Sequence, residues 1–230
     1  MTQSLYDQLE IPERFRYVAI RKVQAEFISQ FIQKNNLKKT LEIGFAYGCS
    51  AAHIINATKS KHIVIDPKTE IWGNLGFKNL EKLGLEKYLT FIKDQSHNAL
   101  PRLLEEGTKL DFAFIDGNHF FEYIMVDFHF IDKMLEQDGY IMFDDSWLRA
   151  TQLVASYIQK NRKDYKEIKA LPENTIMFQK IGEDKRIWYH FREFYTLKSM
   201  ISYRRNIWKY WRNIWRYKKQ WDKEYHEKKF

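Results

Sequence analysis

The sequence predicts an α/β fold built on a doubly wound, mostly parallel sheet whose last strand is antiparallel. Short apolar runs rich in β-branched and aromatic residues alternate with helical stretches, which is typical of βαβ units. The chain has 230 residues, including Phe 17, Tyr 14 and Trp 7. Such a chain can bury the core of one domain with an appendage and has far too many aromatic residues to be disordered.

A helix is expected before the sheet. Apolar residues between Phe15 and Ile32 recur every three to five positions and stop near Asn35, which predicts an amphipathic helix that caps the domain. Seven strands are expected after it. Their ranges are Thr40–Ile43, His62–Ile65, Tyr88–Ile92, Leu110–Ile115, Tyr140–Phe143, Tyr165–Ala170 and Thr175–Ile181.

The last two predicted strands flank a turn-like stretch, Leu171–Asn174, that is short enough for an antiparallel hairpin. The sheet would then end in a reversed edge. The sequence therefore divides into an N-terminal capping helix in residues 1–36, a Rossmann-like domain in residues 37–182 and a C-terminal tail in residues 183–230.

Charge and aromatic content are concentrated in the tail. The formal net charge is +8, but Lys185–Phe230 holds 14 Lys or Arg against 4 Asp or Glu, a net +10. The preceding residues hold 24 against 26 and are slightly acidic. The basic character thus belongs to the tail, and the charge of the predicted domain gives no indication of a polyanionic substrate.

The loop after the first strand has the features of a ligand site. Leu41–Ser50 passes from a strand through Gly44, Ala46 and Gly48 into a helix, so a ligand can approach the backbone and the helix N-terminus. The spacing is not that of the dinucleotide fingerprint. Glu42 stands where a pyrophosphate would be repelled and an ammonium group attracted. Asp66, at the end of the second strand, is placed to accept hydrogen bonds from a ribose.

This stretch resembles the first motif of the class I S-adenosylmethionine-dependent methyltransferases, an acidic residue followed by Gly-x-Gly/Ala-x-Gly. The alternative is tight packing of a helix on a strand. The resemblance implies that the methionine part of the cofactor contacts the first loop, the ribose contacts Asp66, and the adenine lies near Asp94 and Ser96. The residues of the first loop are Glu42, Gly44, Ala46, Tyr47, Gly48 and Ser50.

Three carboxylates follow the fourth and fifth predicted strands. Asp116 ends one strand, and Asp144 and Asp145 end the other. Their convergence on one sheet edge favours a divalent cation such as Mg²⁺, because unpaired like charges repel one another. For any single residue, the alternative is a helix cap or an ion pair with Arg149.

The span from Asp111 to Trp147 looks like the metal-dependent branch that methylates sugars of macrolides and surface polysaccharides. That resemblance implies that Asp116, Asp144 and Asp145 bind the cation, and that His119 is the general base with Asp116 beside it in the catalytic centre. Many relatives have an acidic residue where Asn118 stands. The signature of the amino-methylating members is absent after the fourth strand, which favours an oxygen acceptor.

The expected function is transfer of a methyl group from S-adenosylmethionine to a saccharide hydroxyl with Mg²⁺ assistance. The alternatives are a phenol or catechol acceptor, or a non-catalytic adaptor that retains the fold. A lone Cys49 and the absence of an apolar span in the sequence predict a cytoplasmic protein.

The tail contains a seven-residue echo, Arg205–Tyr210 and Arg212–Tyr217, and has no Gly or Pro after Lys185. This predicts an amphipathic helix with a break near Ser202. Trp and Tyr beside Arg and Lys favour peripheral attachment to an anionic membrane. Self-association into a homo-oligomer is the second interpretation, and nucleic acid is the least favoured.

Overall fold

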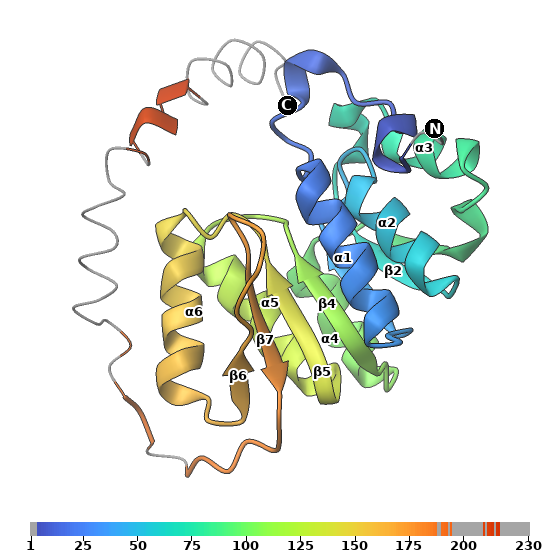
Figure 1. Ribbon diagram of the computed structural model, residues 1–230. Coiled ribbons are helices and arrows are strands. Elements are labelled where there is room, and N and C mark those ends of the chain that lie inside the picture. The colour runs from blue at the N-terminus through green and yellow to red at the C-terminus, as the bar shows by residue number, and fades with distance from the viewer. Residues whose placement is uncertain are drawn as a thin grey trace.

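The structure, a computed structural model, describes residues 4–187, 190–192, 194, 209, 211–213, 215 and 216. Its centre is a seven-stranded sheet of order β3-β2-β1-β4-β5-β7-β6 (Figure 1). The strands are β1 (Thr40–Ile43), β2 (His62–Ile65), β3 (Leu89–Ile92), β4 (Leu110–Ile115), β5 (Leu135–Phe143), β6 (Tyr165–Glu167) and β7 (Ile176–Lys180). Only β7 runs antiparallel to its neighbours, which confirms the predicted fold class and the antiparallel last strand.

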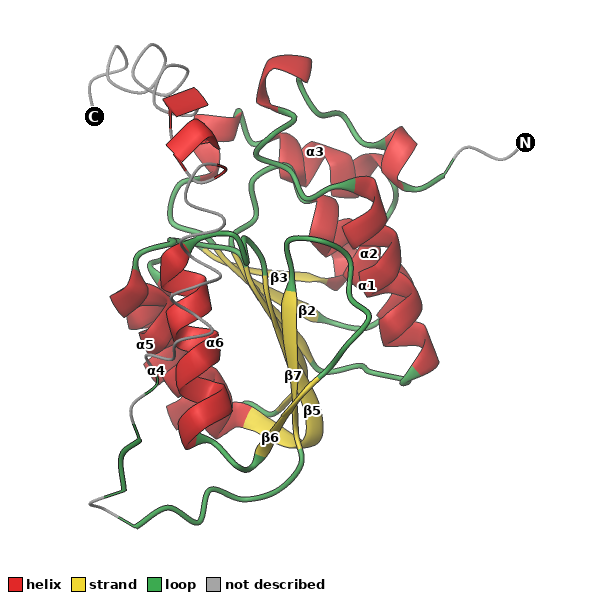
Figure 2. Cartoon of the chain, turned by 60° about the vertical axis from the view of Figure 1, so that its left-hand side comes forward, coloured by secondary structure: helices red, strands yellow, loops and turns green. Residues whose placement is uncertain are grey.

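Helices cover both faces of the sheet (Figure 2). One layer contains α1 (Lys22–Lys34), α2 (Cys49–Thr58) and α3 (Leu75–Lys82), and the other contains α4 (Ser96–Glu105), α5 (Phe121–Met134) and α6 (Arg149–Asn161). Short 3-10 helices occur at Tyr6–Gln8, Glu13–Phe15, Thr69–Trp72 and Glu86–Tyr88. The result is a three-layer sandwich in which both faces of the central strands are buried.

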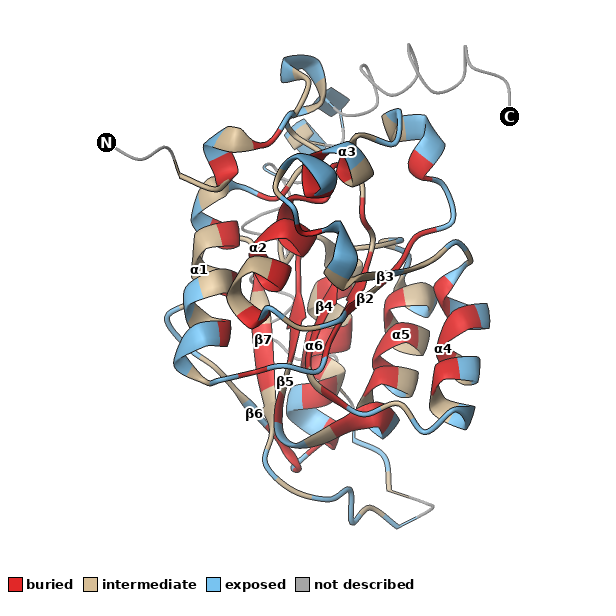
Figure 3. Cartoon of the chain, turned by 90° about the vertical axis from the view of Figure 1, so that its right-hand side faces the viewer, coloured by how far each residue is buried: buried red, intermediate tan, exposed pale blue. Residues whose placement is uncertain are grey.

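Alternation along β4 divides the apolar core into two parts. Phe112 and Phe114 belong to the cluster beneath α1 and α2, whereas Ala113 and Ile115 belong to the cluster beneath α4, α5 and α6. All four side chains are at most 4% exposed, and Figure 3 shows the sheet buried between both helical layers. A strand that is apolar at every position is what a doubly covered parallel sheet requires.

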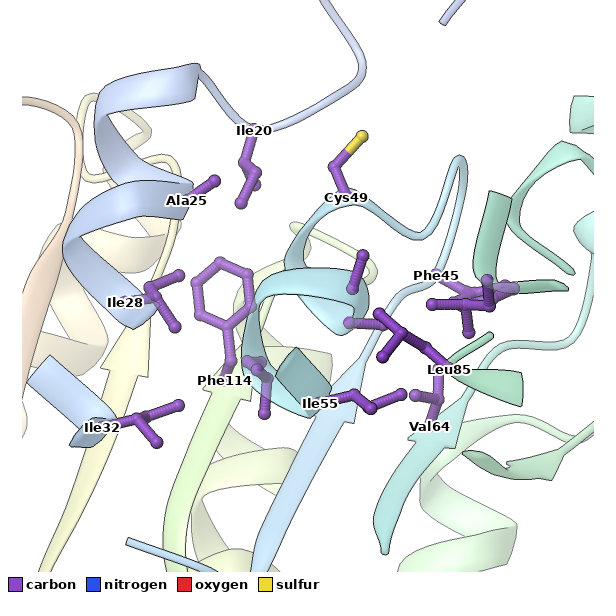
Figure 4. Packing of buried hydrophobic residues seen from close by; sticks show 14 of the residues in the cluster. Ile20, Ala25, Ile28, Ile32, Phe45, Cys49, Ile55, Val64, Leu85 and Phe114 are labelled. Atoms are coloured by element: carbon purple, nitrogen blue, oxygen red, sulfur yellow. The ribbon is translucent and has the colours of Figure 1, made fainter. Parts of the chain in front are cut away.

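The N-terminal helix packs on this core, as the sequence predicts, but it begins later. Ile28 and Ile32 of α1 point toward Phe114, which lies on the face of the sheet that α1 covers (Figure 4). The helix begins at Lys22 because the extended Arg21 is its N-cap and the Gln24 side chain accepts a hydrogen bond from the Arg21 backbone at 2.8 Å. The apolar positions before Arg21 belong to a separate 3-10 helix and a loop.

β5 and β6 differ most in length from their prediction, whereas β3 begins one residue later and β7 is one residue shorter at each end. β5 begins at Leu135, five residues before its predicted start. The composition of Glu136–Gly139 is that of a turn, but the strand continues through these residues with Asp138 at φ +66°. β6 ends at Glu167, where its pairing with β7 stops. The added residues of β5 lie at the edge opposite the expected site, whereas β6 runs toward the site edge and Glu167 lines the cleft there.

The described start of the tail is not helical, in contrast to the predicted tail helix. Residues 183–187, 190–192 and 194 are irregular and are fixed against α6. The Asn161 side chain pairs with the Arg192 backbone through bonds of 2.7 and 2.9 Å, and the Phe194 ring contacts Tyr157 with centroids 5.8 Å apart. Side chains of α6 thus satisfy backbone groups that a helix would have satisfied internally. The predicted break near Ser202 lies outside the described residues.

Candidate active site

A single large cleft opens at the edge where the carboxyl ends of the parallel strands meet. Its volume is about 1760 Å³. The loops after β1, β2, β4 and β5 line it, together with the start of α1 and two tail residues, Lys209 and Asn213. In doubly wound sheets the ligand site lies at this edge. The chain therefore places its predicted motifs around one cavity.

The loop after β1 needs its first glycine. Gly44 has φ +95°, and a Cβ added there would lie 2.1 Å from the Asp116 backbone oxygen. Only glycine allows the loops after β1 and β4 to approach this closely. Gly48 has φ +68° and is the N-cap of α2. Gly44, Ala46, Tyr47 and Ser50 line the cleft, whereas Gly48 does not.

Glu42 is a buried carboxylate with two side-chain partners. It is 1% exposed, accepts a hydrogen bond from the Ser50 hydroxyl, and lies 3.1 Å from Nε2 of the buried His62. His62 is held in turn by Thr40 at 2.8 Å. Burial raises the pKa of Glu42, while the contacts with His62 and Ser50 oppose that shift. The side chain is therefore oriented before any ligand arrives.

Asp66 closes the loop after β1 from the next strand. Its Oδ2 accepts hydrogen bonds from the backbone N–H of Phe45 at 2.8 Å and of Ala46 at 3.4 Å, and its Oδ1 accepts one from Lys68 at 2.8 Å. The carboxylate lines the cleft and keeps lone pairs for further donors. This geometry is compatible with the predicted ribose contact.

Of the two residues predicted to lie near the adenine, one lines the cleft and the other does not. Ser96 starts α4 and lines the cleft. Asp94 is not among the lining residues, and its carboxylate binds Arg102 at 2.6 Å and Asn98 at 3.1 Å. These hydrogen bonds lower the pKa of Asp94 to about 2. Gln95, between them, is a lining residue that the sequence did not single out.

Three predicted catalytic and metal residues converge. Asp116, His119 and Asp145 each present one ligand atom, and these atoms all lie within 4.8 Å of one another. His119 Nε2 lies 3.2 Å from Asp145 Oδ2. Among the described residues, no side chain or backbone group donates a hydrogen bond to Asp116. Burial and the charges of Asp144, Asp145 and Glu42 raise the pKa of Asp116 well above its usual range.

Asp144 has a different environment from its neighbour. It is not part of the three-residue group, and its Oδ1 accepts a hydrogen bond of 2.7 Å from the Gln24 side chain of α1. Gln24 is 2% exposed and its amide is oriented by Arg21. Burial and the charge of Asp145 raise the pKa of Asp144 to about 7. The N-terminal helix thus reaches into the site, which its amphipathic pattern does not reveal.

Asp145 is fixed in an unusual conformation. Its φ is +49°, and its Oδ1 accepts hydrogen bonds from Trp147 at 2.8 Å and from Asn174 at 3.0 Å. A left-handed backbone outside glycine is strained and is a feature of functional sites. Asn174 comes from the hairpin between β6 and β7, and sequence reasoning treated it only as a turn residue.

A cation fits this half of the cleft. The half-buried carboxylate of Asp116 lies beside other carboxylates and has no hydrogen-bond donor among the described residues, so its negative charge is left uncompensated by them. Carboxylate and imidazole atoms are suitable ligands for a divalent metal. Of the predicted ligands, Asp116 and Asp145 would hold it, with the candidate base His119 beside them. The predicted contact of Asp144 with the metal stays a prediction.

Comparison with known proteins identifies the domain. Residues 41–146 match a family model described as a methyltransferase domain, and this span contains every candidate site residue from Glu42 to Asp145. Residues 41–146 are therefore similar to a methyltransferase domain, which agrees with the class of enzyme that the sequence predicts.

Two curated plant proteins are similar to this chain. A flavonoid 3',5'-methyltransferase from Vitis vinifera is 29% identical over 143 residues, which are 58% of this chain and 59% of the relative. Tapetum-specific methyltransferase 1 from Arabidopsis thaliana is 28% identical over 167 residues, 70% of this chain and 67% of the relative. The chain thus spans about three fifths to two thirds of these relatives' length.

Solved structures share the fold. An O-methyltransferase from Bacillus cereus in complex with SAH has a TM-score of 0.60 at 12% identity, covering 75% of this chain and 92% of that one. The O-methyltransferase TomG from Streptomyces achromogenes, in complex with SAM, has a TM-score of 0.62 at 14% identity, covering 76% and 92%. Within the described residues, no helix combines the length and apolarity needed to cross a bilayer.

Proposed function

We propose that the chain is an S-adenosylmethionine-dependent O-methyltransferase that acts on a saccharide hydroxyl with the assistance of a divalent metal. The observation that carries this proposal is that the Asp116, His119 and Asp145 group and the loop after β1 line the same cleft. A methyl donor held at one end would then lie beside an acid–base group at the other.

The donor half suits S-adenosylmethionine. Glu42 provides a buried carboxylate for an ammonium group, and Asp66 provides acceptors for ribose hydroxyls. Gly44 leaves room for close approach to the backbone. Burial of a charged ligand group is favourable only against an opposite charge, and Glu42 supplies it.

The acceptor half suits proton removal from a hydroxyl. S-adenosylmethionine supplies the methyl group, and a bound Mg²⁺ would lower the pKa of the acceptor hydroxyl. The acceptor oxygen would bond to the methyl carbon as the carbon–sulfur bond breaks and S-adenosylhomocysteine leaves, and His119 would accept the hydroxyl proton at a ring nitrogen. Asp145 orients the imidazole and stabilises its protonated form, as an oriented carboxylate does for a general base.

The size of the cleft supports a bulky acceptor. A volume of about 1760 Å³ exceeds the roughly 300–1,000 Å³ of an ordinary small-molecule site, so space remains beside a nucleoside cofactor. An extended saccharide would use that space and could stack on aromatic side chains of the cleft, among them Tyr17, Trp72, Phe120 and Trp147.

A phenolic acceptor is the second candidate. The same aromatic lining suits a flat ring, and a relative from Vitis vinifera is named as a flavonoid methyltransferase. Vicinal hydroxyls of a catechol could bind the same metal as a sugar diol. The two candidates share the donor half and the base, and they differ only in what fills the outer cleft.

Methyl-labelled S-adenosylmethionine separates the candidates. The protein is incubated with Mg²⁺ and either a panel of sugars and oligosaccharides or a panel of phenols and catechols, and label in the acceptor is counted. We expect transfer to a saccharide and its loss in His119→Asn. Transfer to phenols alone would select the second candidate. Cofactor binding with transfer to nitrogen acceptors only would contradict O-methylation.

A further inference from the structure

The exposed apolar side chains of this protein are unevenly distributed. Among the described residues, eight large hydrophobic side chains are exposed, and five of them lie on segments that line the cleft: Val23, Ile71, Phe120, Trp211 and Trp215. Scattered exposed apolar residues need no explanation, but a group around one opening indicates an interaction surface. We call these five side chains the rim.

Phe120 is the member of the rim within the catalytic domain that lines the cleft itself. It is 64% exposed and stands directly before α5, one residue from the base His119. Val23 adjoins the lining residue Gln24, and Ile71 adjoins the lining residue Trp72. The rim therefore combines aliphatic and aromatic side chains from separate elements.

The tail adds two tryptophans to the same opening. The described residues between 209 and 216 are helical and lie at the cleft edge of the molecule in Figures 1 and 2. Lys209 and Asn213 line the cleft, whereas Trp211 and Trp215 are 58% and 65% exposed. Residues two apart on a helix point in nearly opposite directions. The tryptophans consequently face outward beside the mouth.

Positive charge accompanies these apolar groups. Arg212 and Arg216 are exposed on the same helical segment, and Lys185–Phe230 carries a net +10. On the domain side, Arg16, Lys68 and Lys169 line the cleft. Tryptophan at headgroup depth with Arg or Lys against anionic headgroups is the composition of an interfacial segment.

We propose that the rim of the cleft rests on an anionic lipid bilayer, with Trp211 and Trp215 at headgroup depth and Arg212 and Arg216 against acidic headgroups. The aliphatic members Val23 and Ile71 favour lipid over nucleic acid, because stacking on bases requires aromatic rings. The mouth of the cleft then opens onto the membrane. A lipid-anchored acceptor could enter without leaving the bilayer, a consequence that rests on the proposed function.

Cosedimentation of the full-length chain tests the proposal without any acceptor or cofactor. Vesicles of phosphatidylcholine alone are compared with mixed phosphatidylglycerol–phosphatidylcholine vesicles at low and high salt. We expect binding to the anionic vesicles that weakens at high salt. Trp211→Ala with Trp215→Ala, and separately Arg212→Gln with Arg216→Gln, should each lower the partition coefficient about tenfold or more.

Matched controls remove the same kinds of side chain far from the rim. Ile181→Ala with Ile187→Ala removes two exposed apolar groups that line a separate hollow with Lys163. Lys163→Gln with Lys166→Gln removes two exposed cations beside β6. Both controls should bind vesicles as the wild type does. Thermal unfolding followed by circular dichroism verifies that each variant is folded.

Four results would overturn the proposal. They are a wild type that stays in the supernatant with both vesicles, rim variants that bind as tightly as the wild type, binding to a single-stranded oligonucleotide but not to vesicles, and concentration-dependent self-association without vesicle binding. None of these depends on methyl transfer, so failure here and failure of the proposed function are distinguishable.

Discussion

Glu42 lies in β1 and Asp116 directly follows the neighbouring strand β4, yet their surroundings are opposite. Glu42 is surrounded by partners, with Ser50 and His62 contacting its two oxygens. Asp116 accepts no hydrogen bond from the described residues and faces Asp144, Asp145 and Glu42. Glu42 is buried and has its hydrogen-bonding capacity met inside the protein, whereas Asp116 is half-buried and lines the cleft.

The difference separates two ways of binding a cation. A carboxylate held by hydrogen-bonding partners is oriented in advance and needs little rearrangement, which favours a ligand of fixed shape such as an ammonium group. A carboxylate beside like charges is destabilised until a cation arrives, which favours a metal ion. The donor half of the cleft is thus preorganised, and the acceptor half is completed by what it binds.

The largest expected effect concerns the base. His119→Asn should lower kcat about 10²- to 10⁴-fold, the usual contribution of general base catalysis, and should leave S-adenosylmethionine affinity within about twofold because the donor half is separate. Steady-state kinetics combined with calorimetry measures both. An equal loss of cofactor affinity would indicate that the two halves are not independent.

Asp116→Asn tests the acceptor half directly. We expect Mg²⁺ affinity to fall by at least the 10- to 100-fold typical of a disturbed metal shell, measured by titration with the metal alone. The raised pKa of Asp116 means that the folded state holds this proton to higher pH than the unfolded state does. The variant should therefore unfold at a higher temperature above neutral pH and gain nothing in acid.

Asp94→Asn is the matched control, because Asp94 is an acidic residue that follows another parallel strand, β3, and is not part of the cleft lining. It should leave Mg²⁺ affinity unchanged. A similar loss in both variants would show that general charge, and not the Asp116 position, attracts the metal.

Glu42→Gln tests the donor half. Loss of a charged partner of the ammonium group should weaken S-adenosylmethionine binding roughly 10- to 100-fold, since hydrogen bonds to charged groups contribute about 1.5–3 kcal/mol. Mg²⁺ affinity should change little. Calorimetric titration of each ligand provides the comparison, and a selective loss of metal affinity would reverse the assignment of the two halves.

Asp127 provides a smaller test, which is how far a buried carboxylate without a hydrogen-bond partner lowers the free energy of unfolding away from the site. It lies in α5, is 1% exposed, and neither oxygen makes a hydrogen bond. Burial raises the pKa of Asp127 to about 7 despite the opposing Ser96 hydroxyl. The folded state therefore loses stability as pH rises from the ordinary carboxyl range through 7. Asp127→Asn should raise the free energy of unfolding by about 2 kcal/mol at pH 8.

The same substitution should have little effect at pH 5, where Asp127 is already protonated in the folded protein. Denaturant unfolding at the two pH values checks both expectations. Equal stabilisation at both would mean that the charge of Asp127 is not the cause.

Much of the domain could be predicted from the sequence, because the candidate site residues stand at or directly after strands with a clear apolar pattern. β1, β2 and β4 have the predicted bounds, and residues directly after them reach the cleft, since the carboxyl ends of parallel strands share one edge. The grouping of Asp116 with Asp145 follows from the same rule. His119 joins them because it stands three residues after Asp116, which directly follows β4.

The supporting contacts could not be predicted, because they join distant segments. Gln24 reaches Asp144 across 120 positions of sequence, and Asn174 reaches Asp145 from the last hairpin. His62 has an ordinary place in an apolar strand, yet it holds Glu42. A hydrophobic pattern reports which face of an element is buried, but it does not report which polar group that face meets.

Calorimetric titration of the wild type with S-adenosylmethionine, with and without Mg²⁺, tests the central claim that one cleft joins a preorganised donor half to a cation-dependent acceptor half. The account predicts one cofactor site whose affinity is nearly the same in both conditions. It also predicts that methyl transfer stops when the metal is removed by chelation. Absence of cofactor binding in both conditions would contradict the claim.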